Sequence, residues 1–208
     1  MSKPLFLAAL LGIGLIQLPA IASACELAPG AQCEDAKLVG AKLRGKNLEK
    51  ANFAGANLSF AALANANLSG ANLSGANLKH ARLRGANLTG ANLEGAIMDY
   101  ADLRDVLMEG ANLRNARMTR VDLKLADLEK ADFTGANMGH ADLSGADLES
   151  AVLRSVSLVS AHIVLANLKH ADFTGANMSD AYLHGSLLKG VIWIDGRSCE
   201  AGSIGMCR

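Results

Sequence analysis

The chain has 208 residues, and its 20 basic and 20 acidic side chains give a formal net charge of zero. This balance argues against a protein whose whole surface is strongly acidic or strongly basic. Half of the residues are apolar but only 4% are aromatic, which suits a narrow interior of aliphatic side chains better than a globular core. We expect a single domain.

Residues 1–24 have the pattern of a secretory signal. Lys3 supplies a short positive end, Leu5 to Ile21 form a nearly continuous apolar run, and Ala22-Ser23-Ala24 resembles a small-residue cleavage site. The apolar run is marginal for a membrane span. The pattern favours soluble export to the periplasm. Lipidation of Cys25, as in bacterial lipoproteins, and an uncleaved anchor are the alternatives, and Ala22 departs from the Leu that lipoproteins normally have three residues before the cysteine.

Four cysteines lie outside the periodic region, two near each end: Cys25, Cys33, Cys199 and Cys207. Each pair has the spacing Cys-x7-Cys, whereas structural metal sites use closer spacings such as Cys-x2-Cys. In an oxidising compartment we expect the bonds Cys25–Cys33 and Cys199–Cys207, with three connectivities formally open. These bonds would fix an N-terminal disulfide cap at 25–35 and a C-terminal disulfide cap at 191–208, because solenoid ends must be covered.

Residues 36–190 read as 31 consecutive units of five with an unbroken phase. Each unit has Leu, Phe, Met or Ile at its centre, and nearly every unit has Ala two residues earlier. The five exceptions at the earlier place are Lys46, Val106, Val121, Val156 and Ser186. A step of five turns an α-helix by ~500°, so the leucines would spiral around the axis. An odd period on a flat strand would alternate their faces. A chain that bends about every five residues gathers them into one interior, as in a solenoid.

The unit Ala-Asn/Asp-Leu-x-x resembles the pentapeptide repeat family over about three quarters of the chain. The resemblance implies an all-β fold, a right-handed quadrilateral β-helix with four units per coil. Residues 36–190 would then form just under eight coils. The resemblance also implies that the central residue and the Ala two before it point inward, and that the other three positions face solvent.

Four units per coil would stack residues that are 20 apart. Phe53, Phe133, Phe173 and Trp193 fall into one such column. The segments 131–138 and 171–178 are identical at a spacing of 40 residues, so a duplication is an alternative explanation for part of the column. Because Phe53 and Trp193 lie outside the duplicated segments, we favour stacking.

Charge is distributed unevenly along the repeats. Residues 36–95 contain eight bases and two acids, and residues 96–150 contain eleven acids and six bases. Two acidic stacks are expected from the coil geometry, one of Asp102, Asp122 and Asp142 and the other of Asp127 and Asp147. They form a candidate acidic patch. The alternative, which we favour, is that Asp is simply frequent at this position of the repeat and that bases such as Arg104 and Lys124 are interleaved.

Apolar side chains at solvent-facing positions mark a candidate interaction surface, because such positions should be polar. The residues concerned are Leu125, Val159, Val164, Leu165 and Tyr182. The alternative is a set of scattered apolar residues on a tolerant surface.

The sequence contains no phosphate-binding glycine loop, nucleophile elbow or Cys–His pair. We therefore expect no enzyme, no catalytic residue, no cofactor and no metal site. The interpretation is an exported, non-enzymatic protein-binding or scaffolding rod in the periplasm. Its protein partner is unknown and no nucleic acid is expected. We expect contact with a membrane only if Cys25 is lipidated. A homodimer is possible.

Two alternatives come from other classes. The fluoroquinolone-resistance members of the family resemble duplex DNA and bind DNA gyrase, so the chain could inhibit or protect a topoisomerase. Such a protein needs a cytoplasmic address and a continuous acidic surface, whereas this chain has an export pattern and a basic N-terminal half. The second alternative is a lipid-anchored structural protein.

Overall fold

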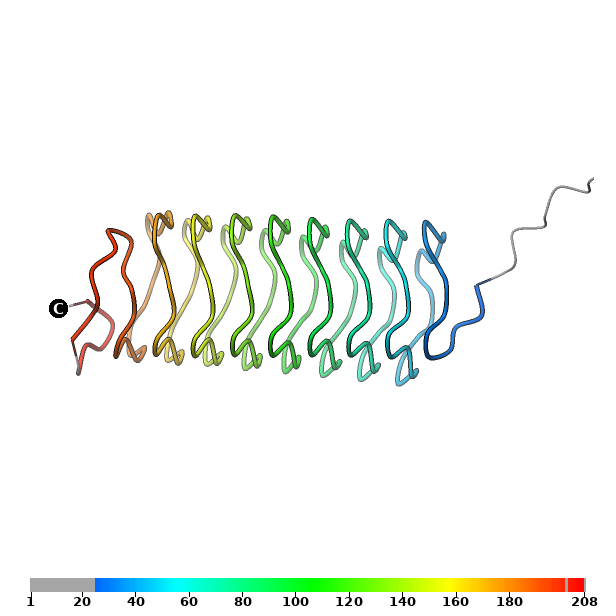
Figure 1. Cartoon of the computed structure of the whole chain (residues 1–208), viewed down its shortest axis with the longest axis horizontal. Helices are drawn as coiled ribbons and strands as arrows, with labels where there is room; N and C mark the ends of the chain where they lie inside the picture. The colour runs from blue at the N-terminus through cyan, green and yellow to red at the C-terminus, as the bar shows by residue number, and fades with distance from the viewer. Residues whose placement is uncertain (1–24, 201, 208) are drawn as a thin grey trace, which may run out of the picture.

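A computed structural model describes residues 25–200 and 202–207. The backbone winds into a rod of stacked coils, with the two ends of the described chain at opposite ends of the rod (Figure 1). The described residues form neither helices nor continuous strands, and their regular structure consists of isolated bridges alternating with two-residue turns. The expected secretory signal at 1–24 lies outside the described residues. Within the described part, no helix is long and apolar enough to cross a membrane.

Residues 20 apart pair with each other across neighbouring coils. Parallel bridges recur every five residues from Gln32↔Asn52 to Asp172↔Ile192, and each joins residues i and i+20. A coil therefore contains four units of five, as the family resemblance implied and the aromatic column supported. Phe133 and Phe173 are both fully buried and lie in the same column, and the Phe173 ring lies 6.1 Å from that of Trp193.

The four units of a coil define four faces of the rod. Face 1 contains the unit that begins at Ala36 and every fourth unit after it, and faces 2, 3 and 4 start in the same way from Ala41, Lys46 and Ala51. Face 4 also includes units 31–35 and 191–195, which take part in the first and last parallel bridges. The periodic backbone thus extends one unit beyond 36–190 at each end, because Cys33 and Trp193 take the inward central place.

Backbone hydrogen bonding explains the composition of a unit. In unit 91–95, the first N–H donates across the preceding turn, the second donates to the previous coil, and the third and fifth donate to the next coil. These four bonds are 2.7–2.9 Å long, and the neighbouring units repeat the pattern. The fourth N–H, that of Glu94, donates to Oδ1 of Asn92 at 3.2 Å. Asn or Asp therefore recurs before the central residue because its side chain accepts a backbone N–H that would otherwise lack a partner.

The fifth residue of each unit adopts a left-handed conformation. Its φ is +63° at Gly90 and +65° at Gly95, which explains the frequent glycine. Leu125 and Leu165 occupy the same place with φ of 58° and 56°. A side chain in this conformation costs about 1–2 kcal/mol.

The interior is a column of aliphatic and aromatic side chains between the four faces, and most central residues and inward alanines are almost fully buried. Ser186 is a polar exception that is fully buried at an alanine place. Its Oγ donates to the carbonyl of Ile163 and accepts from the N–H of Ala166 at 3.0 Å. The hydroxyl therefore inserts into the turn of the previous coil and satisfies both of its backbone groups.

Disulfide-linked segments cover both ends of the rod. The structure joins Cys25 to Cys33 and Cys199 to Cys207. At the C-terminal end the chain reverses, and antiparallel bridges Ile192↔Ser198 and Leu187↔Ile204 replace the parallel ladder. The cap therefore supplies hydrogen-bond partners to coil edges that would otherwise be open.

Candidate protein-interaction surface

The predicted interaction residues lie mostly on one face. Leu125, Val164, Leu165 and Tyr182 belong to units of face 2, whereas Val159 belongs to face 1 and lies across the intervening corner. Leu125, Leu165 and Tyr182 are 66%, 70% and 58% exposed, and the two valines are half-buried. The structure thus brings Val164, Leu165 and Tyr182 together near the C-terminal end and places Leu125 two coils away.

Leu125 and Leu165 each lie against a glycine in the next coil. A Cβ atom added to Gly185 would be 2.6 Å from Cδ2 of Leu165, and one added to Gly145 would be 2.8 Å from Cδ2 of Leu125. The glycines therefore leave the space that the leucine side chains occupy. Each of the two leucine side chains therefore lies next to the following coil and is still mostly exposed.

The C-terminal cap contributes apolar residues that sequence reasoning did not include. Ile204 and Met206 are 61% and 68% exposed. With Tyr182, His184 and Gly185 they line an open hollow of about 660 Å³. The N–H of Gly205 donates to the carbonyl of Ser186 at 3.0 Å and holds the cap loop against the last coil. No repeat register covers the cap, so only the apolar character of these two residues could have indicated them.

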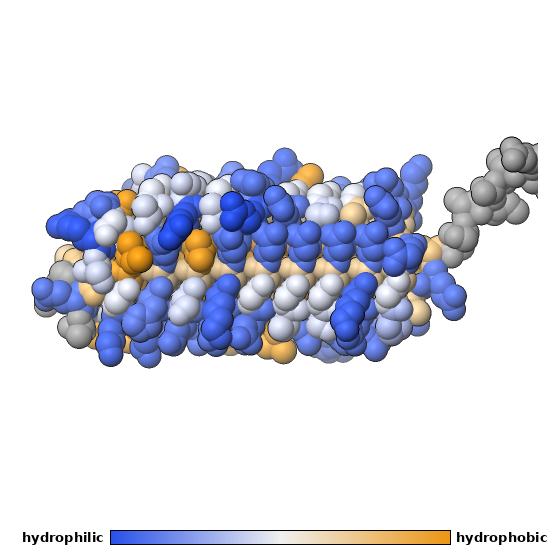
Figure 2. Space-filling view, in the orientation of Figure 1, coloured by the Kyte–Doolittle hydropathy of each residue, from blue (hydrophilic) through white to orange (hydrophobic). Residues whose placement is uncertain are grey.

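Exposed apolar side chains are concentrated toward the C-terminal end of the rod. Figure 2 shows one side of the molecule, which is largely polar, with its larger apolar patches toward that end. Of the twelve large exposed apolar residues in the described part of the chain, seven lie at or after position 165: Leu165, Tyr182, Leu187, Ile192, Ile194, Ile204 and Met206. We use the name C-terminal apolar surface for Leu165, Tyr182, Ile204 and Met206.

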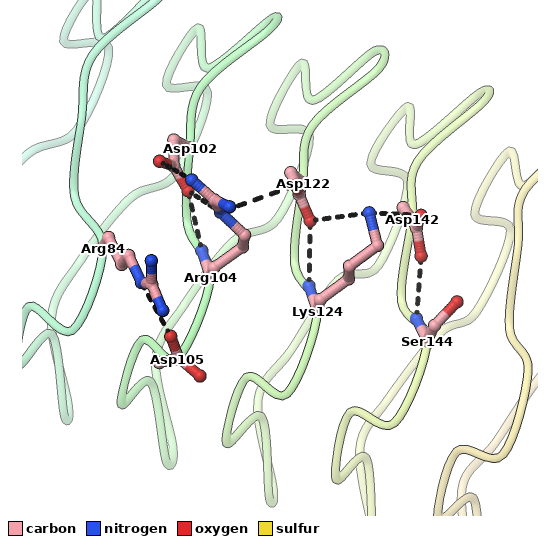
Figure 3. A network of polar contacts seen from close by, with 8 residues as sticks. All are labelled: Arg84, Asp102, Arg104, Asp105, Asp122, Lys124, Asp142 and Ser144. Carbon is pink, nitrogen blue, oxygen red and sulfur yellow. Dashed lines mark hydrogen bonds and ion pairs between the residues drawn. The ribbon is translucent and has the colours of Figure 1, made fainter.

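The expected acidic stack on face 2 is a ladder of alternating charge (Figure 3). Bridges place Asp102, Asp122 and Asp142 in one row. Arg104 donates to Asp102 at 2.7 and 2.8 Å and lies 3.6 Å from Asp122. Lys124 lies 2.7 Å from Asp142 and 3.5 Å from Asp122. Each aspartate also accepts the backbone N–H two residues later. These contacts support the interpretation that the aspartates are repeat residues, which bond to the backbone and to neighbouring cations of the rod.

Asp127 and Asp147 stack in the same way on face 3. Each accepts the backbone N–H of the glutamate two residues later, at 3.3 and 2.9 Å. Asn167 donates to Asp147 and to Glu149 at 3.0 Å. These carboxylates are therefore engaged within the rod. Among the described residues, no group of three or more His, Cys, Asp or Glu could hold a metal ion.

Two of the face 2 aspartates, Asp102 and Asp142, have lowered pKa values. The hydrogen bond from Arg104 lowers the pKa of Asp102 despite partial burial. For Asp142, burial raises the pKa, but hydrogen bonds from Lys124 and Ser144 outweigh it and the net pKa is lowered. Both carboxylates are thus stabilised in their charged form.

These shifts predict a loss of stability in acid. Because the folded pKa values lie below the unfolded value of about 3.9, the stabilisation is present above pH ~4 and is lost as the pH falls through the folded values. We expect Arg104→Gln with Lys124→Gln to lower the free energy of unfolding at pH 6 by at most about 1 kcal/mol per pair, since the pairs are partly exposed. Thermal melts from pH 6 to pH 2 should show the gap from wild type closing in acid; a gap that stays constant would contradict the prediction.

A second ladder, of aromatic rings, was not anticipated from the sequence. On face 1, the His80 ring stacks between Phe60 and Tyr100, with ring centroids 4.9 and 5.1 Å apart. Lys79 Nζ lies 5.9 Å from the centre of the Tyr100 ring. The signal was the spacing of 20 residues, which the three rings share.

The repeat region of the chain is similar to a known protein family. A family model for pentapeptide repeats matches eight copies over residues 31–70, 71–110, 96–135, 131–169 and 151–190. No curated protein matches the sequence.

Several solved structures are similar to the chain. HetL, a pentapeptide repeat protein involved in heterocyst differentiation regulation from the cyanobacterium Nostoc sp. strain PCC 7120, is 31% identical over 80% of this chain and 78% of its own, with a TM-score of 0.50. A trypsin-treated variant of QnrB1, a plasmid-mediated fluoroquinolone resistance protein, is 20% identical over 81% and 85%, with a TM-score of 0.40. Rfr23 from the cyanobacterium Cyanothece 51142 is 33% identical over 48% and 62%, with a TM-score of 0.26.

These comparisons agree with the coiled arrangement of the backbone. The family and HetL imply a right-handed quadrilateral β-helix, and the described coils have the four units per turn that such a helix requires. Proteins of this kind are generally non-enzymatic structural or binding proteins. Because the family model spans residues 31–190 and HetL is similar over most of both chains, this chain belongs to the pentapeptide repeat family.

Proposed function

We propose that this protein is a non-enzymatic binding rod of the periplasm that holds a protein partner through its C-terminal apolar surface. The observation that carries the proposal is the apolar hollow between face 2 and the cap, where Tyr182, Ile204 and Met206 are all more than half exposed. Exposed apolar residues that gather around a hollow are typical of interaction sites, whereas single ones are not.

Leu165 adds an independent argument. It is 70% exposed and has a φ of 56°, a conformation that glycine adopts without strain. A leucine here gains little from burial and has a conformational cost of about 1–2 kcal/mol. Many non-glycine residues share this conformation, because it belongs to the fifth place of every unit, so the distinctive feature of Leu165 is its large, exposed, apolar side chain. Binding of a partner by the leucine side chain would account for its presence.

Two features support export in a soluble form. The pattern at 1–24 is that of a secretory signal, and all four cysteines are in disulfides, which persist in oxidising compartments. Lipidation of Cys25 would consume the sulfur that the structure pairs with Cys33. The intact mass of the mature protein, with and without reductant, tests this part. A lipid adduct, a retained signal or four free thiols would contradict it.

The binding proposal predicts separate effects of Leu165→Gly on binding and on stability. We expect this variant to reduce capture of specific periplasmic partners at least about tenfold, as loss of a central apolar contact does. Its melting temperature should stay within about 2 °C of wild type, because relief of strain offsets the greater chain entropy of glycine. Quantitative cross-linking and pull-down from periplasmic extract measure the first effect, and a thermal melt measures the second.

Phe60→Gly is the matched control. Phe60 is also exposed, at 58%, and has a φ of 59°, but it lies on face 1 near the other end of the rod. This variant should capture the same partners as wild type. No specific partner with wild type, or equal losses in the two variants, would overturn the proposal. Light scattering shows whether the captured partner is a second copy of the chain.

A topoisomerase inhibitor or protector of the DNA-mimic type is disfavoured by the charge pattern. Such a mimic needs a continuous acidic surface, whereas Arg104 and Lys124 interrupt the row of aspartates on face 2. A gyrase supercoiling assay with the purified mature protein distinguishes the two proposals. Strong inhibition would favour the mimic.

A further inference from the structure

A group of cations surrounds two alanines on face 2, near the N-terminal end of the rod. Bridges Lys42↔Ala62 and Ala62↔Arg82 place these three residues in register on successive coils. Two residues further along each unit, Arg44, Ala64 and Arg84 repeat the same order. The two alanines form a low floor on the middle coil, and long basic side chains rise from the coil before and the coil after. We call this arrangement the basic cradle.

The cradle contains an open hollow of about 410 Å³. Arg44 and Arg84 line it from opposite sides, Ala64 lies between them, and Asn65, Gly85 and Asp105 complete its lining. The four cations are exposed, and the two floor alanines are half-buried. The side chains can therefore reach a ligand above the floor without rearrangement of the backbone.

The charges of the cradle are largely uncompensated. Among the ion pairs of the described residues, none includes Lys42, Arg44 or Arg82. Arg84 contacts Asp105 through Nε at 2.9 Å. Further along the same face, Arg104 and Lys124 each bind aspartates of their own or the next coil (Figure 3). The face thus changes from unpaired cations to an ion-paired ladder in which three aspartates outnumber two cations.

We propose that the basic cradle binds a compact ligand with two or more phosphoryl or sulfate groups. Coils stack ~4.8 Å apart, so the two rims are roughly 10 Å apart, and two arginine side chains can converge on one oxyanion between them. Positions two apart along a unit are separated by ~7 Å, so Lys42 and Arg82 reach a second anionic group. Arginine binds such groups with two parallel hydrogen bonds.

The charge reversal along face 2 limits the size of the ligand. A long polyanion or a flat anionic membrane that followed the face beyond Arg84 would meet the carboxylates of Asp102, Asp122 and Asp142. Like charges at such short range repel. A compact ligand that spans three coils avoids this repulsion, and we therefore infer a small multiply charged molecule rather than a polymer.

Calorimetric titration of the full mature protein with tripolyphosphate at low salt tests the proposal. We expect saturable one-to-one binding that weakens as salt screens the charges. Arg44→Ala and Arg84→Ala should each weaken binding about tenfold, as loss of a charged hydrogen bond does. Ala64→Glu should abolish binding, because it places a carboxylate on the floor. Thermal melts check that each variant is folded.

Lys37→Ala is the matched control, because Lys37 is an exposed cation of face 1 that is also outside the ion pairs. It should bind tripolyphosphate as wild type does. No saturable heat, or an equal loss in Lys37→Ala and Arg44→Ala, would overturn the proposal. Binding to anionic phospholipid vesicles without binding to tripolyphosphate would also overturn it, since it would assign the cations to a membrane surface.

Discussion

Insertion of one alanine between Thr89 and Gly90 should lower the melting temperature by roughly 10 °C or more. The insertion shifts every later residue by one place relative to the coil before it, so pairs 20 apart no longer coincide at this site. The bond from Leu88 N to Leu107 O, at 2.7 Å, joins residues on either side of the insertion, so it and its neighbours must break or bulge. Loss of one buried leucine costs about 1.5–3 kcal/mol. Lost hydrogen bonds add to this, and 1 kcal/mol corresponds to about 2–4 °C in a chain of this size.

Two controls separate register from local chemistry. Thr89→Ser changes an exposed side chain and should leave the melting temperature within about 2 °C of wild type. Insertion of a complete coil, a copy of residues 71–90, keeps all pairs 20 apart and should preserve or raise the melting temperature. If the single-residue insertion melts at the wild-type temperature, the argument from register is wrong.

The interior could be predicted from the sequence because every inward place recurs with the same period. The leucine positions and the aromatic column from Phe53 to Trp193 follow from spacing alone, and the bridges between residues 20 apart agree with them. The family resemblance supplied the number of units per coil. The ends were less predictable. Cys33 breaks the pattern of leucines, yet it is buried in the central place and extends the rod by one unit.

The surface could be predicted only in part, because its properties depend on contacts between coils. The row of aspartates on face 2 was expected from the spacing. Whether Arg104 turns toward Asp102 and Asp122 is decided by side-chain conformation, which the repeat does not specify. The same holds for the basic cradle, which depends on two small residues, Ala62 and Ala64, between the large ones. Residues of the cap, such as Met206, have no repeat register at all.

Removal of the C-terminal disulfide should have the second large effect. With Cys199→Ser and Cys207→Ser we expect a loss of about 2–3 kcal/mol from the free energy of unfolding, as for a closed loop of this length. The melting temperature should fall by about 5–10 °C. The cap reverses the chain and binds the last coil through Cys199 N to Val191 O at 2.8 Å. Without the disulfide, the cap is held against the last coil only by noncovalent contacts such as this hydrogen bond.

Opening of the cap should also change how the rod associates. Leu188 and Val191 are fully buried beneath the cap. Their exposure would uncover an apolar end and an unpaired coil edge, which favour end-to-end association. We therefore expect light scattering of the double variant, at a temperature well below its melt, to show concentration-dependent oligomers that the disulfide-bonded protein lacks. A variant with Ser198→Ala, which leaves the disulfide intact, should behave as wild type. The prediction is wrong if the double variant has the melting temperature and the oligomeric state of the wild type. In that case the backbone contacts hold the cap, and the disulfide is not needed to protect the end of the rod.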